Sequence, residues 1–488
     1  MFKKGNRMIR PRLLRRPVAL ALAIALLPAA ASAEDLLQTY ELARQGDPQL
    51  SAAESNRLAI REGSVQARAA MLPQLNGEAS YRRSRSEGPA TQTQFDPTTG
   101  EPVEFRGDID SETTTRNIGI NGSQMLFDLS RFTTLGSRNA LSRATDFQLE
   151  SANDSLVTRT SAAYFNVLVA LETLAAAEAA ETALQKQFDF ASKRLEVGLA
   201  PITDVHEARA TYDSARANTI LARNAVEDAY QALAEITGQP VRNLKGLPED
   251  FQPALPASQG ADQWVQTAVD NNPALRAKEL QVESAEADIR TARAGHLPTL
   301  YLNGGYGDTK TTGDRTFSSA DLPTSVTSPI ESESRGPNVG IVLSVPIFSG
   351  GATQSQVRQA VAQRDVAQDE LVQQRRALER NTRNAYQALV AGISEIEARR
   401  LALFSARSAY DASQVGLEVG TRTVLDVLTN QQNLFTAQQA LAQARYNYLQ
   451  NLLLLEQAAG TLDIEDVQEV NRLLTVDAEA QVQSDVVP

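Results

Sequence analysis

The sequence predicts a mostly α-helical protein with a smaller β part, in which one pattern of elements occurs twice. Of its 488 residues 42% are hydrophobic but only 5% are aromatic, so the core must consist mainly of Ala, Leu, Val and Ile. That composition is typical of long helices that pack through small residues. Long stretches without Gly or Pro support the helices, and alternating segments between them predict the strands.

Strings in the first half recur in the second at offsets that drift only between 225 and 221 residues. The matching pairs are 47–50 with 272–275, 72–75 with 297–300, 117–127 with 338–348, 197–205 with 419–427, and Gly238 with Gly460. Such self-similarity indicates a tandem duplication with small loop insertions. We therefore expect a first repeat at 34–260, a second at 261–460 and a C-terminal tail at 461–488.

The first 33 residues have the pattern of a secretory signal peptide. Seven Lys and Arg residues between Lys3 and Arg16 precede an apolar run from Val18 to Leu27, and 31–33 form a small-residue cleavage site. The run is shorter than a bilayer-spanning helix. Without these seven of the 47 basic residues, 40 basic residues face 59 acidic ones, a net charge of −19.

Composition disfavours several classes of protein. Nucleic-acid binding needs a basic surface, which the acidic mature chain lacks. Cysteine is absent, so disulfides, thiolate metal sites, a cysteine nucleophile and a lipid-modified N-terminal cysteine are excluded. His206 and His296 lie in different repeats without a zinc-binding spacing, and no phosphate-binding GxxxxGKS/T loop occurs. We predict that the protein is not an enzyme and has no metal or cofactor.

Each copy begins with a helix between two prolines. These helices are expected from Pro48 to Leu72 and from Pro273 to Leu297, because proline is tolerated at a helix start and stops a helix further on. Two extended segments follow in each copy. They are expected at about 74–86 and 114–127 within the strand pair 74–127, and at about 299–311 and 338–348 within the strand pair 299–348.

The extended segments alternate in character as transmembrane strands do. In the last of them one face carries Val339, Ile341, Leu343, Val345 and Ile347, and the other carries smaller residues such as Asn338, Gly340 and Ser344. The polar stretches 87–113 and 312–337 are expected to be loops facing water. An ordinary soluble sheet is the alternative interpretation of the same alternation.

A very long helix is expected next, because 137–197 contains 61 residues without Gly or Pro, or about 90 Å of helix. A break at 198–201 leads into a second helix that ends at Gly238. Copy two breaks at about 416–420 and ends at Gly460. Heptad spacing along the long helices predicts coiled-coil packing, shown by Leu149, Leu156, Ala163, Ala170, Ala177, Leu184, Leu371, Leu378 and Ala385.

Four strands per chain predict an oligomer. Four strands cannot close a membrane barrel, and an open sheet edge in hydrocarbon would leave N–H and C=O groups unsatisfied. Three chains would supply twelve strands, a number within the range of outer-membrane barrels. We therefore expect a homotrimer that contacts outer membrane lipid.

Over nearly its whole mature length the chain resembles the TolC-like outer-membrane channel-tunnel proteins. The strings that carry the resemblance lie in order at 163–168, 197–199, 202–205, 349–351, 419–423 and 444–449. The resemblance implies a trimer with a 12-stranded outer-membrane barrel and a 12-helix periplasmic tunnel. It also implies that the trimer docks onto a periplasmic adaptor and an inner-membrane efflux pump or ABC transporter, and exports drugs or, in type I secretion, proteins.

The resemblance places a gate at the periplasmic helix turns. Carried over onto matching residues, it assigns Asp426 to an acidic ring and lets Arg422 bond to the neighbouring coil near Thr203 and Asp204. The alternative role for the two aspartates is to cap the helices that follow them.

Two positions depart from the family pattern. Leu417 stands where a tyrosine would supply a further gate hydrogen bond, and Thr429 stands where a second aspartate ring would lie. The sequence therefore predicts a looser and less acidic gate. The alternative function is a periplasmic coiled-coil adaptor of an efflux system, although an adaptor would not need duplicated strand pairs.

Overall fold

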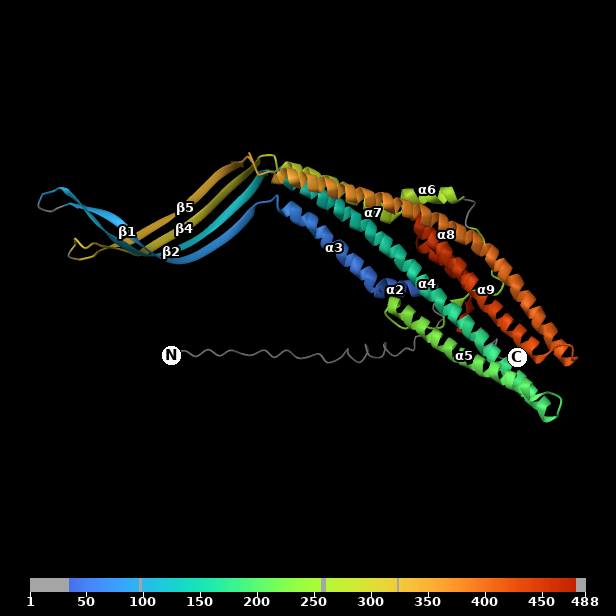
Figure 1. Ribbon diagram of the computed structural model, residues 1–488. Helices are drawn as coiled ribbons and strands as arrows, with labels where there is room; N and C mark the ends of the chain where they lie inside the picture. Colours follow the sequence, from blue (N-terminus) through green and yellow to red (C-terminus); the bar gives the residue numbers. More distant parts are fainter. Residues whose placement is uncertain (1–34, 96–98, 256–259, 323, 480–488) are drawn as a thin grey trace, which may run out of the picture. The chain divides into compact units, whose positions relative to one another are not determined.

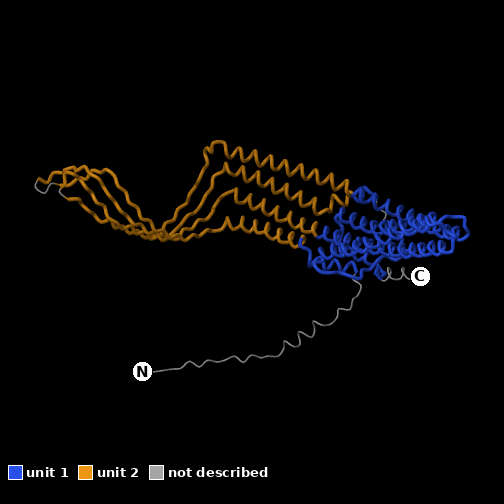
Figure 2. Tube along the Cα trace, turned by 60° about the horizontal axis from the view of Figure 1, so that its bottom comes forward, with its two compact units in different colours: residues 1–48, 153–264, 382–488 blue, residues 49–152, 265–381 orange. Residues whose placement is uncertain are grey.

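The computed structural model describes residues 35–95, 99–255, 260–322 and 324–479, so the predicted signal peptide lies outside the described residues. The chain forms two compact units, coloured separately in Figure 2. Unit 1 comprises 1–48, 153–264 and 382–488, and unit 2 comprises 49–152 and 265–381. Each unit takes segments from both halves of the sequence, so the sequence repeat is not a unit of packing.

The helices and strands alternate along the chain as two similar series (Figure 1). The first series is α2 Leu36–Gly46, α3 Pro48–Ala69, β1 Gln74–Phe95, β2 Pro102–Phe127, α4 Leu129–Glu196 and α5 Ile202–Thr237. After β3 Lys245–Gly246, the second is α6 Ala261–Asn271, α7 Pro273–Ala294, β4 Thr299–Ser318, β5 Val326–Ser344, α8 Ala352–Glu418 and α9 Val424–Ala459. The described chain ends with α10 Ile464–Leu473 and β6 Val476–Asp477. None of the described helices combines the length and the apolar character needed to cross a membrane.

Unit 2 contains a four-stranded antiparallel sheet with the strand order β1-β2-β4-β5. The central pairing of β2 with β4 joins the two halves of the sequence. The outer strands β1 and β5 each have one edge that pairs with no strand in the described part of the chain.

The strands are longer than the sequence predicted. The segments 87–95, 102–113, 312–318 and 326–337, expected to be loops, belong to strands. The prediction of long polar loops was therefore wrong, because cross-strand pairs such as Arg85 with Asp110, 2.8 Å apart, stabilise these polar segments. At its other end β5 stops at Ser344 rather than Phe348, since Pro346 has no N–H to donate to the sheet.

The helices of unit 2 repeat the order of the strands. Polar side-chain contacts join α3 to α4, α4 to α7 and α7 to α8, and Figure 2 shows these segments side by side. The contacts are Arg57 to Asp146 at 2.5 Å, Ser137 to Ser284 at 3.0 Å and Lys278 to Glu370 at 2.7 Å. Each strand of the sheet is therefore continued by the helix that has the same place in the order.

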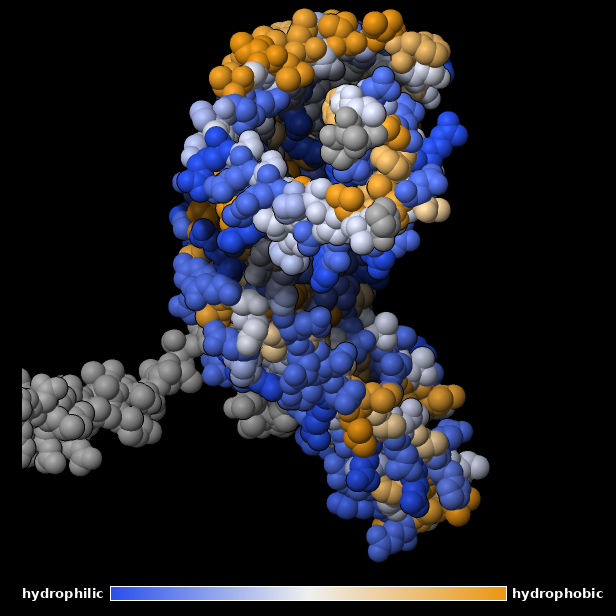
Figure 3. All heavy atoms as spheres, turned by 90° about the vertical axis from the view of Figure 1, so that its left-hand side faces the viewer, coloured by the Kyte–Doolittle hydropathy of each residue, from blue (hydrophilic) through white to orange (hydrophobic). Residues whose placement is uncertain are grey.

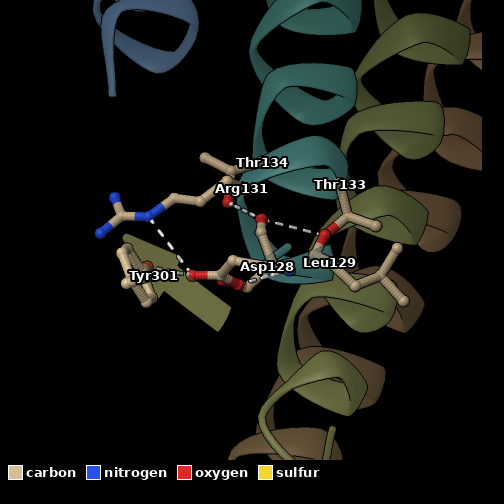
Figure 4. Close-up of polar contacts among 7 residues, drawn as sticks. Asp128, Leu129, Arg131, Thr133, Thr134 and Tyr301 are labelled. Carbon is tan, nitrogen blue, oxygen red and sulfur yellow. Dashed lines mark hydrogen bonds and ion pairs between the residues drawn. The ribbon is translucent and has the colours of Figure 1, made fainter. Parts of the chain in front are cut away.

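Asp128 fixes the junction between β2 and α4 (Figure 4). Its buried carboxylate accepts hydrogen bonds from the N–H and hydroxyl of Ser130, at 3.0 and 2.5 Å, and from the Tyr301 hydroxyl on β4 at 2.8 Å. Burial raises the pKa of Asp128, but these hydrogen bonds and the charge of Arg131 outweigh burial and hold the pKa below its usual value. The carboxylate thus caps α4 and ties it to the neighbouring strand.

In unit 1, α4 packs against α5 through small and polar side chains. The Thr219 hydroxyl on α5 donates to the Ala177 carbonyl on α4 at 3.3 Å, and Arg223 pairs with Glu178 at 2.7 Å. In the second hairpin a Cβ on Gly392 of α8 would lie 3.7 Å from the Tyr448 ring of α9. Close approach through small residues is thus a property of both hairpins.

The described part of the predicted C-terminal tail contains a helix and a strand. β6 pairs with β3, and Asn471 of α10 accepts a hydrogen bond from the Leu36 N–H at 3.0 Å. The Tyr164 hydroxyl bonds to both the N–H and the carbonyl of Lys245, at 2.9 Å each. The tail and one of the strings that carry the family resemblance therefore have structural roles in unit 1.

Candidate functional site

The turns that join α4 to α5 and α8 to α9 share one backbone conformation. Gly198 and Gly420 have φ angles of 75° and 77°, which glycine adopts without strain. In each turn the residue after the glycine donates its N–H, at 2.8 Å, to a carbonyl in the last helical turn, that of Arg194 or Gly416. Both long helices thus end in a glycine C-cap.

The helices that follow the two turns start differently. The Thr423 hydroxyl accepts a hydrogen bond from the Asp426 N–H at 3.2 Å, and the Asp426 carboxylate accepts bonds from the N–H and hydroxyl of Thr423, both at 2.9 Å. This is a capping box at the start of α9. Pro201 occupies the equivalent place before α5 and makes no side-chain capping bond.

The carboxylate of Asp426 is negatively charged at neutral pH. The hydrogen bonds from the Thr423 N–H and hydroxyl lower its pKa, and the charge of Arg422 lowers it further. The helix-capping role that the sequence left open for Asp426 is therefore present. Asp204, in the first turn of α5, instead accepts a long bond of 3.5 Å from the Thr203 hydroxyl.

The side chain of Arg422 lies across the end of α8. A Cβ on Gly416 would lie only 2.6 Å from Cγ of Arg422, so glycine at this position makes room for the arginine. Within the described part of one chain, no hydrogen bond or ion pair joins Arg422 to Thr203 or Asp204. The structure thus brings together two pairs, Thr203 with Asp204 and Arg422 with Asp426.

An apolar cluster connects the two hairpins beside the turns. Val424 and Leu428 of α9 pack with Leu184 of α4 and Ala215 of α5. Leu417 of α8 packs against this cluster, so the residue that departs from the family pattern makes apolar contacts. Moving one hairpin relative to the other would disrupt the cluster.

Several residues that position this site were not predicted from the sequence. Thr423 could have been identified, because a Thr three residues before an Asp is the pattern of a capping box. Gly416 and Val424 give no comparable signal, since their roles depend on Arg422 and on helices from the first half of the chain. The stacked rings of Phe188 and Tyr212, with centroids 6.2 Å apart, were missed for the same reason.

The two turns carry charged and hydrogen-bonding side chains. Within residues 35–479, apart from the short undescribed segments, no group of three or more His, Asp or Glu side chains is placed to hold a metal ion. His206 lies on α5 in unit 1, and His296 follows α7 in unit 2. The ionised Asp426 carboxylate can attract cations and accepts hydrogen bonds from Thr423.

Comparison with known proteins places this geometry in context. The model of the family "Outer membrane efflux protein" matches residues 39–239 and 264–461. The chain is 32% identical to outer membrane protein TolC of Vibrio cholerae over 94% of this chain and 98% of that protein. It is 32% identical to the alkaline protease secretion protein AprF of Pseudomonas aeruginosa, over 89% and 86%. Its fold is similar to the outer-membrane channel OprN, with a TM-score of 0.69 at 20% identity over 88% and 90% of the two chains.

Proposed function

Because the chain belongs to the outer membrane efflux protein family, we propose that three copies of it form an exit duct for drugs, proteins or both. The protein lies in the outer membrane, and its family works with periplasmic adaptors and inner-membrane pumps. The adaptor alternative is not favoured, since the relatives are outer membrane proteins. The proposed activity is conduction and not catalysis.

The proposal of a trimer rests on the open sheet of unit 2. β1 and β5 run antiparallel to each other, so β1 of one copy can pair with β5 of the next. Unpaired edges cost several kcal/mol per unsatisfied backbone group in hydrocarbon. Three copies would close a twelve-stranded barrel and leave no edge.

The two faces of the sheet differ as those of a barrel wall do. One face carries apolar residues, among them Leu75, Ile118, Ile120, Tyr306, Val339, Ile341 and Leu343. The opposite face carries Asn76, Ser80, Asn117, Asn121, Thr309 and Asn338. We place the apolar face against lipid and the amide and hydroxyl face in the lumen.

Disulfide trapping can test the trimer. Because the natural chain has no cysteine, only the introduced cysteines can form disulfides. Ser80→Cys in β1 is combined, one variant at a time, with cysteine at Ser332, Ser334, Gly336 or Asn338 of β5, which samples the possible registers. In at least one variant, oxidation in cells should give a ladder of cross-linked chains that stops at three.

The matched control combines Ser80→Cys with Asn117→Cys, which face each other within one chain. This pair should form an intramolecular disulfide and no ladder. A ladder that continues beyond three copies contradicts the trimer. So does the absence of intermolecular product in all four β5 variants when the control pair forms.

The two helix turns form the gate in this proposal. Three copies would bring three Asp426 carboxylates around one opening, and Arg422 would bond to Thr203 or Asp204 of a neighbouring hairpin. The negative charge of Asp426 and its proximity to Arg422 support these roles. The exposed Thr429 adds no second ring of charge, so Asp426 would carry most of the cation attraction.

A further inference from the structure

On the apolar face of the sheet, apolar side chains give way to charged ones a short distance along each strand, first at Asp308 and Arg335, then at Arg116 and last at Arg83. The last mainly apolar level contains Gly77, Ile120, Tyr306 and Pro337, and two levels beyond it lie Tyr81, Arg116, Lys310 and Glu333. Figure 3 shows hydrophobic side chains gathered in a band along its upper margin, with hydrophilic surface below. A narrow boundary of this kind, which all four strands cross, is typical of a membrane interface.

Two cations lie side by side at this boundary. Arg116 of β2 is directly opposite Lys310 of β4 in the strand register. Like charges at directly opposed positions destabilise a sheet. An anion bound between the two side chains would convert this repulsion into attraction.

The carboxylates nearest to Arg116 are paired with other cations. Arg116 is exposed and, among the residues that the structure describes, makes no ion pair. Asp308, one level closer to the apolar band, is held by Arg335 at 2.5 Å. Lys310 is 3.5 Å from Glu331 and 3.9 Å from Glu333, both on the side of β5, away from Arg116.

We propose that Arg116 and Lys310 bind the phosphate group of an outer-leaflet lipid whose acyl chains lie along Ile118 and Ile120. The proposal rests on the proposed function, since this face meets lipid only in the assembled barrel. We favour a lipid as the source of the phosphate because the two cations adjoin the apolar band. A lipid whose phosphate lies at this level can place its acyl chains along that band. Basic residues beside an apolar surface attract anionic lipids in this way.

Native mass spectrometry of the detergent-purified trimer with lipid A, a glycolipid that carries two phosphates, tests the proposal. EDTA is present so that divalent cations do not link the phosphates to carboxylates. Up to three tightly bound lipid molecules per trimer are expected. Arg116→Gln with Lys310→Gln should weaken this binding about 30-fold, or about 2 kcal/mol for the two charges.

Arg82→Gln with Arg315→Gln is the matched control, because it removes the same charge from the opposite face of the sheet. The control should bind lipid A as the natural chain does. Equal binding by the Arg116 and Lys310 double variant, or an equal loss in the control, overturns the proposal.

Two further probes identify the source of the phosphate. Dephosphorylated lipid A should bind the natural chain as weakly as lipid A binds the double variant, and inorganic phosphate should not displace lipid A. Displacement by inorganic phosphate would indicate a free-anion site and overturn the lipid assignment. All samples are first shown to be trimers, so loss of the trimer contradicts the proposed function and loss of selective binding contradicts only this inference.

Discussion

Separate variants can distinguish the observed capping role of Asp426 from its proposed role in the gate. Asp426→Asn keeps an oxygen that can accept the Thr423 N–H but removes the charge. Because converging carboxylates attract cations more strongly than an open surface does, we predict lower cation selectivity and weaker block by multivalent cations from the periplasmic side. Thr423→Ala removes the capping hydroxyl and keeps the charge, so it should lower the melting temperature and leave selectivity intact. Planar-bilayer recordings measure cation selectivity and block. If both are unchanged in Asp426→Asn, this residue only caps α9.

Arg422 should act on the closed state rather than on selectivity. Its side chain lies across Gly416 at the end of α8, and in the proposed trimer it bonds to a neighbouring hairpin. We predict that Arg422→Ser raises single-channel conductance, because the turn loses a clamp while the Asp426 charge remains. Conductance equal to that of the natural chain would remove Arg422 from the gate.

Glu456 should make stability depend on pH. Burial raises the pKa of this α9 carboxyl, and Asp466, Asp463 and Glu469 raise it further. A carboxyl whose pKa is higher in the folded state keeps its proton longer when folded, so the free energy of unfolding falls as pH rises from about 4.3 through the raised value. We predict that Glu456→Gln raises the melting temperature at pH 7 but not below about pH 4.

The control for Glu456 is Glu465→Gln, at an exposed position on α10. It should shift the melting temperature little at either pH. If Glu456→Gln and Glu465→Gln show the same pH profile, the burial argument fails.

At the scale of elements, Gly46 allows the end of α2 to pack closely against the end of α5. This is the tightest helix contact that a glycine allows in unit 1. A Cβ on Gly46 would lie 2.3 Å from the carbonyl oxygen of Thr237. We predict that Gly46→Ala destabilises the protein by about 1 to 3 kcal/mol, as overpacking does. Gly63→Ala in α3, whose Cβ would lie 3.7 Å from its nearest neighbour, should instead stabilise by about 0.5 to 1 kcal/mol. Chemical denaturation measures both, and similar values for the two variants would contradict the packing argument.

The lengths of the strands were predicted wrongly from the sequence. Polar Thr, Ser and charged residues in 87–113 and 312–337 read as loops when considered one strand at a time. In the sheet these residues pair across strands, as Ser84 does with Thr113 at 2.9 Å. Pairing decides whether such a segment is a strand, because its stability comes from the neighbour rather than from its own composition.

At the scale of the whole molecule, the proposed duct requires the hairpin connections to face the cell exterior. Peptide tags inserted after Gly100 and after Ala320 should be labelled on intact cells by an impermeant reagent. A tag after Gly198 in the α4–α5 turn should be labelled only after the outer membrane is broken, because the long helices need periplasmic space. The reverse pattern of labelling would invert the topology.

The sequence by itself determined the order of elements, the duplication and the class of protein. Glycine and proline end helices through local backbone geometry, so α5 and α9 stop before Gly238 and Gly460 as predicted. The family resemblance followed from strings in a fixed order and spacing. The sequence also identified Asp426 and Arg422 as candidates, although the structure alone showed the Thr423 capping box and the contact with Gly416.

Only the tertiary structure decided which residues from different halves of the chain meet. The pairing of β2 with β4 sets Arg116 beside Lys310, and the two hairpins share the cluster of Leu184 with Val424. Neither contact has a local signal, since the residues are 194 and 240 positions apart and their approach depends on strand register and helix packing. Secondary structure here follows from short-range backbone preferences, whereas the surfaces that would meet lipid and form the gate follow from long-range pairing.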